Sequence, residues 1–294
     1  MGNPIADTWI YATVHIDNEQ GGEATGFLVP RENENRIRVF LVTNKHVVGQ
    51  DKEARANIGS ITLHVNVTLP DGQLEGRTAK VVLATETDGR KSIREHPEAD
   101  VDVLAIDVSH LIYRFPEIKK KLVDYGAFAF NDRLKELDIT IGDDVMIIGY
   151  PHGIRHEGTA YPFVRAGIIA SRIGERLQDA VPDPKGGYRK RTLRGFLVDG
   201  GIIPGSSGSP VVLKPVIGRR VKRTIRLAPS PPILLGIVAE TRYAPIHIGG
   251  DVGDTLSFAG LGLAFDAETI KETVELFFQR ELGWRPRFHL RQTV

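Results

Sequence analysis

The sequence contains 294 residues, of which 41% are hydrophobic and 26% are charged, with 31 glycines. Because folded domains usually run roughly 100–200 residues, this length predicts one large domain or two small ones, and the composition excludes collagen-like, coiled-coil and low-complexity chains. Lysine and arginine (38) nearly balance aspartate and glutamate (37), so no global charge indicates a nucleic-acid or membrane surface. The absence of cysteine excludes disulfides, thiolate metal sites, iron–sulfur clusters and cysteine nucleophiles.

The first eight residues carry no basic segment followed by an apolar core, and no stretch of the sequence reaches the roughly 18 apolar residues needed to span a membrane. The Met-Gly start is similar to a myristoylation signal, but Ala6 stands where that signal has Ser or Thr. We therefore expect a soluble, cytoplasmic protein with no membrane partner.

The first 110 residues consist of short apolar or alternating runs, rich in Val, Ile and Thr, separated by turn-forming clusters. The predicted strands are Trp9–Ile16, Ala24–Val29, Arg36–Thr43, Ile61–Leu69, Thr78–Ala84 and Val101–Val108. A connector from Leu111 to about Leu137 follows, and Pro116 is typical of the first position of a helical turn within it.

A second series of strand-like runs begins at Ile139. Its predicted strands are Val145–Gly149, Pro162–Arg172, Thr192–Val198, Pro210–Val216, Arg219–Leu227, Ile233–Glu240 and Ser257–Phe265. Two such series predict two β-barrels or sandwiches. After them the pattern changes to that of an amphipathic helix. Asp266 is its predicted N-cap, Ile270 and Val274 lie on its apolar face, and Gly283 is its predicted end.

The segment Pro-Gly-Ser-Ser-Gly-Ser-Pro-Val-Val (204–212) carries the strongest chemical signal. A serine between glycines, at the entry to an apolar strand, fits a tight turn that exposes its hydroxyl and aims backbone N–H groups into one concavity, as a developing oxyanion requires. The alternative is an ordinary Gly/Ser-rich hairpin turn.

A serine nucleophile needs a base, usually a histidine. His46 ends the apolar strand Phe-Leu-Val-Thr-Asn-Lys-His-Val-Val (40–48), where the chain turns. His152 and His156, in a Gly/Pro-rich loop, are its rivals. We interpret His15 and His64 as structural strand residues.

The third group should be a carboxylate that can be buried and hydrogen-bonded. Asp102 directly precedes the apolar run Val103–Ile106, so it is held at the mouth of a buried strand. Asp100 lies two positions earlier on the same strand face and is the runner-up. A lone aspartate before a strand is otherwise a turn residue.

Six segments, in this order, resemble the trypsin/chymotrypsin-like serine peptidases, and more closely the bacterial branch that includes the high-temperature-requirement proteases. They are Ala-Thr-Gly-Phe-Leu-Val (24–29), Leu-Val-Thr-Asn-Lys-His-Val-Val (41–48), Asp-Val-Leu-Ala-Ile (102–106), Gly-Tyr-Pro-His-Gly (149–153), Gly-Ser-Ser-Gly-Ser-Pro (205–210) and Leu-Gly-Ile-Val (235–238). The resemblance covers roughly residues 10–265.

The resemblance implies an all-β fold of two six-stranded antiparallel β-barrels, chymotrypsin-like, with a C-terminal α-helix. Residues 1–135 would form the barrel with the histidine and aspartate, and 136–265 the barrel with the serine. Residues 266–294 would form the helix and a tail, without the peptide-binding PDZ domain that many bacterial relatives carry.

It also implies a catalytic triad of Ser207 as nucleophile, His46 as general base and Asp102 as the group that orients the imidazole. The N–H groups of Gly205 and Ser207 would form the oxyanion hole, in which one donor typically contributes roughly 3–4 kcal/mol.

For substrate binding, the resemblance places Gly201 at the floor of the specificity pocket, and Ala239 and Glu240 beside the substrate backbone. Glycine at position 201 disfavours a preference for Arg or Lys, and the neighbouring Ile202 and Ile203 favour a small or aliphatic side chain. Ser206 departs from the digestive relatives, which have aspartate there to receive a new N-terminus, so maturation by that route is not expected.

Other readings have weaker support. Residues 172–195 and 214–226 are locally basic, but Tyr188 is their only aromatic residue and gives no series of rings for base stacking. Solvated hairpins are therefore favoured over a nucleic-acid surface, with an exosite as an open alternative. We expect no cofactor and no metal, because the spacing of His152 and His156 is interrupted by Gly153 and one of the clustered acids is better used beside His46. The cluster is Glu95, Glu98, Asp100 and Asp102.

An α/β-hydrolase is disfavoured, since Ser209 stands where the nucleophile elbow of that fold has glycine, and only His247 and His289 follow the serine in the sequence.

The sequence thus predicts a serine endopeptidase acting on protein or peptide substrates through an acyl-enzyme. Two alternatives stay open. One is a latent peptidase that an effector or regulatory partner activates, and the other is a catalytically silent trypsin-fold binding or scaffold protein.

Overall fold

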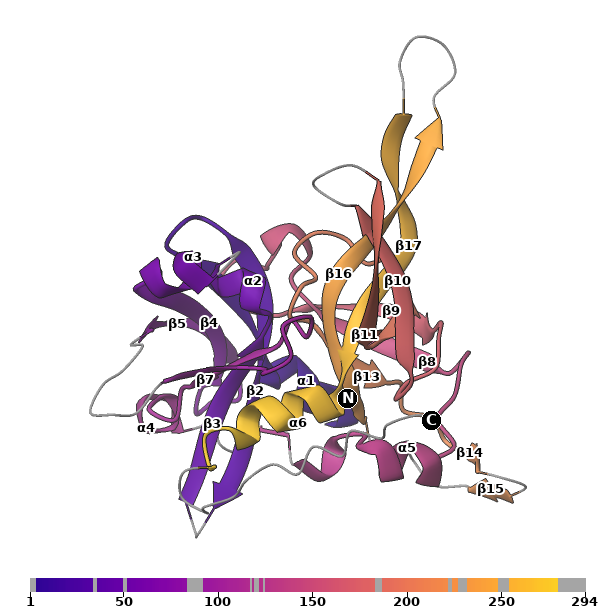
Figure 1. Cartoon of the computed structure of the whole chain (residues 1–294). Helices are drawn as coiled ribbons and strands as arrows, with labels where there is room; N and C mark the ends of the chain where they lie inside the picture. The colour runs from indigo at the N-terminus through magenta and orange to yellow at the C-terminus, as the bar shows by residue number, and fades with distance from the viewer. Residues whose placement is uncertain are drawn as a thin grey trace.

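The computed structural model places two β-structures side by side, with a helix lying across both (Figure 1). It describes residues 4–33, 36–49, 52–83, 92–116, 118, 122–123, 125–182, 187–221, 224–226, 232–247 and 254–279. The N-terminal half supplies the first sheet and the C-terminal half supplies a closed barrel.

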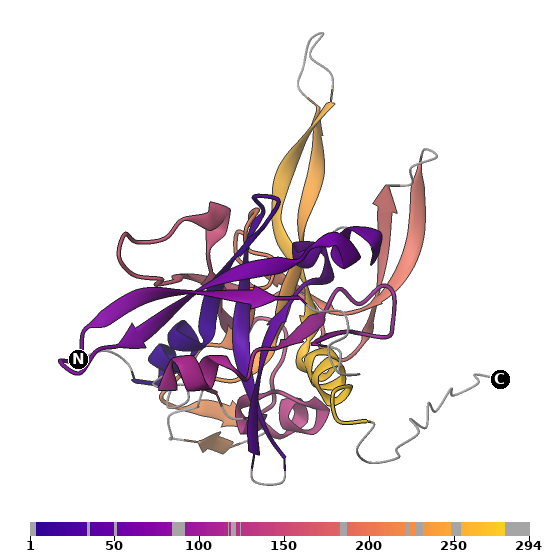
Figure 2. The same cartoon turned by 90° about the vertical axis from the view of Figure 1, so that its left-hand side faces the viewer.

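The N-terminal sheet is antiparallel and barrel-like, with strand order β5-β4-β1-β2-β3-β7-β6 (Figure 2). Its strands are β1 (Thr13–Asn18), β2 (Glu23–Asn33), β3 (Arg36–Thr43), β4 (Ser60–Thr68), β5 (Leu74–Val82), β6 (Ile93–Glu95) and β7 (Leu104–Asp107). Alternating side chains such as Leu28, Leu41 and Leu63 fill its interior. The short helices α2 (Lys45–Val48) and α3 (Lys52–Asn57) follow β3.

The start of the chain differs from the prediction, because Trp9–Ala12 belong to helix α1 (Pro4–Ala12) and only Thr13 begins a strand. The strand propensity of Trp, Ile and Tyr is overridden by packing. The Trp9 side chain is fully buried between the two halves, and its indole N–H donates to the Pro232 carbonyl oxygen at 3.1 Å.

The connector contains α4 (Leu111–Arg114), the 3₁₀ turn η2 (Tyr125–Ala127) and α5 (Asn131–Glu136). The helical turn predicted from Pro116 falls largely outside the described residues. The strands β6 and β10 (Arg176–Pro182) were not predicted, since β6 has three residues and β10 lies in a polar, charged segment.

The C-terminal half closes into a six-stranded barrel with order β12-β17-β16-β13-β8-β9. Its strands are β8 (Asp144–Gly149), β9 (Phe163–Ile169), β12 (Phe196–Asp199), β13 (Pro210–Leu213), β16 (Leu234–His247) and β17 (Asp254–Asp266). Between β8 and β9 lies the 3₁₀ turn η3 (Pro151–Gly153). The barrel interior is filled by side chains that include Ile147, Phe196 and Leu235.

Both basic segments form two-stranded hairpins. The first joins β10 to β11 (Tyr188–Arg194), and the second joins β14 (Arg219–Val221) to β15 (Thr224–Arg226). The predicted strand Thr192–Val198 is therefore divided between β11 and β12. The β10–β11 and β16–β17 hairpins project from the barrel in the same direction in both views.

The helix α6 (Ala267–Glu275) begins where the sequence predicts, and the Asp266 side chain accepts from the Thr269 N–H at 3.1 Å. Its buried face includes Ile270 and Val274, as predicted, and packs in the core shared by the two halves. The helix ends at Glu275, earlier than the predicted Gly283, which lies outside the described residues.

The fold class predicted from the sequence is confirmed: a mostly β protein with a closed six-stranded barrel, a second barrel-like sheet and a C-terminal helix. The division at residues 135 and 265 stays a prediction. Among the helices that the structure describes, none combines the length and the apolar character needed to cross a membrane.

Candidate active site

His46 and Asp102 lie together at the end of two neighbouring strands of the N-terminal sheet. Strand β3 ends one residue before Asn44, and the turn into α2 carries His46. The Nδ1–H of His46 donates to Oδ2 of Asp102 at 2.5 Å, and Oδ1 of Asp102 accepts from the backbone N–H of Lys45 at 2.6 Å. Because the carboxylate is held by the backbone that carries the imidazole, the ring is fixed in one orientation and tautomer.

The environment of His46 shifts the basicity of its ring. Burial lowers the pKa of His46, but the hydrogen bond to Asp102, the charge of Asp102 and the charge of Glu240 outweigh it, so the pKa is raised above its ordinary value. The protonated imidazole is thereby stabilised, as a general base requires.

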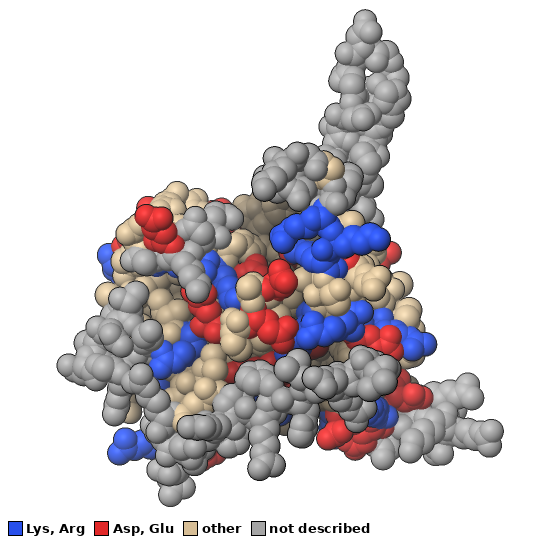
Figure 3. Space-filling model, in the orientation of Figure 1, with Lys and Arg blue, Asp and Glu red and all other residues tan. Residues whose placement is uncertain are grey.

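The loop that carries Asp102 is fastened to α6. The Lys45 ammonium donates to the carbonyl oxygens of His96 (3.0 Å) and Glu98 (3.2 Å). His96 Nε2 lies 2.9 Å from the carboxylate of Glu272, which also pairs with Arg194 at 2.7 Å. On this face acidic and basic side chains alternate (Figure 3). Sequence reasoning missed this network, since its members come from distant segments.

The loop before Ser207 has two unused backbone donors. In the part of the chain that the structure describes, neither the Gly205 nor the Ser207 N–H donates to an acceptor. The neighbouring carbonyl groups are turned away, because Pro204 O accepts from the His152 N–H at 3.0 Å and Gly205 O accepts from the Thr25 hydroxyl at 3.2 Å. The two amides that the sequence nominates for an oxyanion hole are thus available.

Glycine is required at two positions of this loop. Gly205 has φ +84° and Gly208 has φ +85°, in the left-handed region. A Cβ atom at Gly205 would collide with the His152 backbone nitrogen and lie 2.8 Å from Tyr150 O, and one at Gly208 would collide with the Thr25 backbone. The Gly-x-x-Gly spacing therefore follows from close backbone approach.

The Ser207 hydroxyl donates to the carbonyl oxygen of Ala239 at 3.2 Å. Among the described residues, no hydrogen bond joins it to His46. The same segment is bound to the N-terminal sheet, since the Thr25 N–H donates to Ser207 O at 3.0 Å. The candidate nucleophile therefore lies where the two halves meet, with its hydroxyl turned to strand β16.

Arg165, on β9, links the predicted pocket floor to the residue before Ser207. Its guanidinium donates to the Gly201 carbonyl oxygen at 2.7 Å and to the Ser206 hydroxyl at 2.6 Å. The Ser206 side chain is fully buried. No local sequence pattern connects Arg165 to these positions, so only the barrel closure identifies it.

Glu240 is paired with an arginine of the β10–β11 hairpin. Both of its carboxylate oxygens accept from Arg191, at 3.1 and 2.6 Å, and Arg191 also pairs with Asp179 at 2.9 Å. Arg242 bonds Asp179 at 2.7 Å. The hairpin is in this way tied to the strand that contains Ala239.

Among the described residues, no hydrogen bond joins the side chain of a rival candidate to His46 or Ser207. Asp100 is exposed, whereas Asp102 contacts the imidazole. The ring of His156 stacks on Phe163 at 5.6 Å between centroids, and His152 contributes through its backbone.

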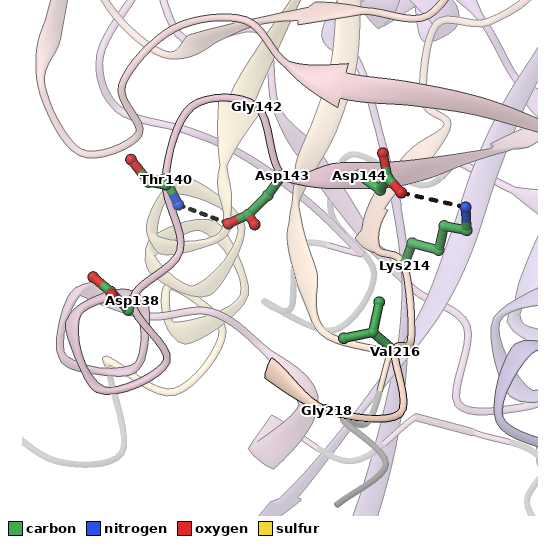
Figure 4. A pocket seen from close by; sticks show the side chains of 8 residues that line it. All are labelled: Asp138, Thr140, Gly142, Asp143, Asp144, Lys214, Val216 and Gly218. Atoms are coloured by element: carbon green, nitrogen blue, oxygen red, sulfur yellow. Dashed lines mark hydrogen bonds and ion pairs between the residues drawn. The ribbon is translucent and has the colours of Figure 1, made fainter. Parts of the chain in front are cut away.

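A separate pocket of about 470 Å³ lies at the start of β8 and the end of β13 (Figure 4). Its lining residues are Asp138, Thr140, Gly142, Asp143, Asp144, Lys214, Val216 and Gly218. Asp143 accepts from the Thr140 N–H at 2.8 Å and Asp144 pairs with Lys214 at 3.3 Å, so these carboxylates are internally satisfied. It contains none of the candidate catalytic residues.

A closed six-stranded barrel beside a barrel-like sheet, with a histidine–aspartate pair on the sheet and a Gly-Ser loop before β13, is typical of a trypsin-like protein. The family model described as a trypsin-like peptidase domain matches residues 24–215, well over half of the chain, and the chain belongs to this family.

Solved structures are similar in fold. The crystal structure of Deg5 shares 16% sequence identity, with 94% of this chain and 92% of that chain covered and a TM-score of 0.51. The active form of the Rv3671c protease from M. tuberculosis shares 16% identity, with 97% and 86% covered and a TM-score of 0.48. No curated protein sequence matches.

Proposed function

We propose that the protein is a serine endopeptidase that uses Ser207, His46 and Asp102. The observation that carries this proposal is the 2.5 Å hydrogen bond between His46 Nδ1 and Asp102 Oδ2, in a chain of the trypsin-like peptidase family. The unused amides of Gly205 and Ser207 support it, because acyl transfer requires donors for a developing oxyanion.

In the proposed reaction, Ser207 Oγ attacks the carbonyl carbon of the scissile peptide while His46 Nε2 takes the hydroxyl proton. The carbonyl oxygen becomes an oxyanion that accepts from the Gly205 and Ser207 N–H groups. His46 then gives the proton to the leaving amine, which departs, and an ester to Ser207 remains. A water molecule, deprotonated by His46, hydrolyses this ester and restores the hydroxyl.

We propose further that the resting enzyme is restrained by the bond from Ser207 to Ala239 O. A substrate strand that pairs with β16 would donate its own N–H to Ala239 O, in the manner of β-augmentation. The serine hydroxyl would then be released toward His46. Activation by substrate, or by an effector that acts on β16, is the form of latency that this contact supports.

We propose a preference for a small or aliphatic side chain at the specificity pocket, whose floor the resemblance assigns to Gly201. Ile202 is buried, and a Cβ atom at Gly262 on β17 would lie 2.9 Å from Ile202 Cβ. An aliphatic side chain therefore packs against β17 next to Gly201. We propose cytoplasmic protein or peptide substrates, consistent with a chain without cysteine.

A fluorophosphonate probe tests the mechanism, because it reacts covalently with an activated serine. We expect labelling of the full chain and loss of labelling in Ser207→Ala. The matched control is Ser209→Ala, since the buried Ser209 hydroxyl has no hydrogen-bond partner among the described residues. Labelling that survives Ser207→Ala would overturn the assignment. Absence of labelling and of casein cleavage, with peptide ligands present, would favour a silent scaffold.

A further inference from the structure

A second histidine–aspartate cluster lies on the N-terminal sheet, away from the catalytic candidates. In the pairing of β1 with β4, His15 is directly opposite His64, and Asp17 follows two residues after His15, on the same strand face. One ligand atom from each of the three side chains lies within 4.8 Å of the other two. Sequence reasoning took both histidines as structural, because only the register brings them together.

The three side chains of this cluster bring possible ligand atoms close to one another. His15 Nδ1 lies 3.2 Å from Asp17 Oδ1, yet this carboxylate oxygen is buried and has no hydrogen-bond partner among the described residues. Ligands at about 2.0–2.2 Å from one tetrahedral ion lie roughly 3.4 Å apart. His64 Nε2 is hydrogen-bonded to Asp17 Oδ2 at 2.5 Å, and this bond would have to open for the two groups to become the second and third ligands of one ion.

Packing holds the His15 side chain in a fixed orientation. The side chain is fully buried, and the edge of its ring packs on Tyr150 with centroids 5.0 Å apart.

Arg155 lies beside the cluster and carries a positive charge. Its guanidinium lies 3.3 Å from His15 Nδ1 and 4.0 Å from Asp17 Oδ2. The Arg155 side chain is 37% exposed and lies on the loop after η3, so it can turn toward solvent when a divalent cation takes its place. A pocket of about 410 Å³, lined in part by His64 and Arg155, gives access to solvent.

We propose that His15, Asp17 and His64 form a Zn²⁺ site. Two neutral imidazoles and one carboxylate are ligands that Zn²⁺ accepts readily, with water in the fourth position. The site shares no residue with the proposed triad, but His15 pairs across β1 and β2 with Thr25, which bonds the Gly205 and Ser207 carbonyl groups. Its role would be to brace the sheet on which the nucleophile loop rests.

Zn²⁺ titration calorimetry on metal-stripped Ser207→Ala protein, which cannot cleave itself under the proposed mechanism, tests the site directly. We expect one Zn²⁺ bound per chain and a rise in the melting temperature. Asp17→Asn and His64→Gln should each weaken binding by at least roughly 10–100-fold. These side chains are 33% and 16% exposed, so the variants are expected to fold, which circular dichroism checks. Arg155→Ala should bind as tightly or more tightly, because it removes a competing cation.

The matched control is His156→Ala, which removes a histidine from the same pocket but outside the proposed ligand set. It should bind Zn²⁺ with unchanged affinity and stoichiometry. Absence of binding by the parent, equal binding by folded Asp17→Asn and His64→Gln, or loss of binding in His156→Ala would each overturn the assignment. Because Co²⁺ in a tetrahedral site absorbs visible light strongly, Co²⁺ substitution gives a second readout, which should disappear in His64→Gln.

Discussion

The hydroxyl of Ser207 donates to the carbonyl oxygen of Ala239 at 3.2 Å, while His46 Nδ1 is bonded to Asp102. Under the proposed function, the imidazole that acts as general base is therefore oriented before the serine hydroxyl is released to it. Under the proposed function, a substrate N–H that binds Ala239 O competes for the same acceptor and releases the hydroxyl.

This competition predicts that inhibitors able to pair with β16 react faster. A peptidyl phosphonate should inactivate the enzyme faster than its analogue methylated at the N–H that would bind Ala239 O. Loss of one hydrogen bond of about 1.4 kcal/mol corresponds to roughly tenfold in the second-order rate constant. Residual activity measured at a series of incubation times gives the inactivation rate constants of both compounds. Methylation at the far end of the peptide is the control, and equal rates for all three compounds would remove the substrate-release argument.

Asp102→Asn should reduce kcat by about 10⁴-fold, because an amide in place of the carboxylate favours the wrong imidazole tautomer and no longer stabilises the charged ring. Asp100→Asn is the matched control, since Asp100 is exposed and two residues away. Its kcat should stay within about twofold of the parent. Equal losses in the two variants would show that Asp102 has no special role.

Gly205→Ala should reduce kcat by roughly 10²–10³-fold, the usual effect of losing one oxyanion donor. The new Cβ atom would collide with the His152 backbone and displace the Gly205 N–H. Gly142→Ala provides a control with the same kind of strain, because Gly142 has φ +88° and open space around its Cβ position. It should lose about 1 kcal/mol of stability but retain kcat, and equal kcat losses would contradict the oxyanion assignment.

The sequence predicted what local chain geometry determines. His46 and Ser207 were recognised because a strand ending in a turn and a Gly-flanked turn are read from consecutive residues. Arg165 and Glu272 were not, because their contacts depend on barrel closure and on the docking of α6. The helical start of the chain was missed since the burial of Trp9, more than two hundred residues from its partner Pro232, outweighs strand propensity.

The raised pKa of His46 predicts the acidic limb of the pH profile. Activity requires the neutral imidazole, so kcat/KM should rise with pH through the His46 pKa, at a pH above the ordinary value of 6.5. Glu240 contributes a negative charge that favours the protonated ring, so Glu240→Gln should move this limb to lower pH. Glu175→Gln, which alters an exposed pair with Arg172, should leave it unchanged. An unshifted limb in Glu240→Gln would contradict the coupling.

Glu272 joins α6 to the Asp102 loop and should make stability depend on pH. Burial raises the pKa of Glu272, but the hydrogen bonds from His96 and Arg194 and their charges lower it to about 2, from an ordinary 4.5. A group whose pKa is lower in the folded state contributes stability above its unfolded pKa, and this contribution is lost as pH falls from about 4.5 to about 2.

Glu272→Gln should therefore reduce the free energy of unfolding at pH 7, and the difference from the parent should shrink on acidification. Because the Glu272 side chain is 44% exposed, solvent screening limits the expected loss to about 1 kcal/mol. Urea unfolding of Ser207→Ala protein at pH 7 and pH 3 measures it. Glu136→Gln, which breaks an exposed pair with Arg133, is the control and should change stability little. Since Glu272 also secures His96, kcat should fall more in Glu272→Gln than in Glu136→Gln. The opposite order would show that α6 does not support the catalytic residues.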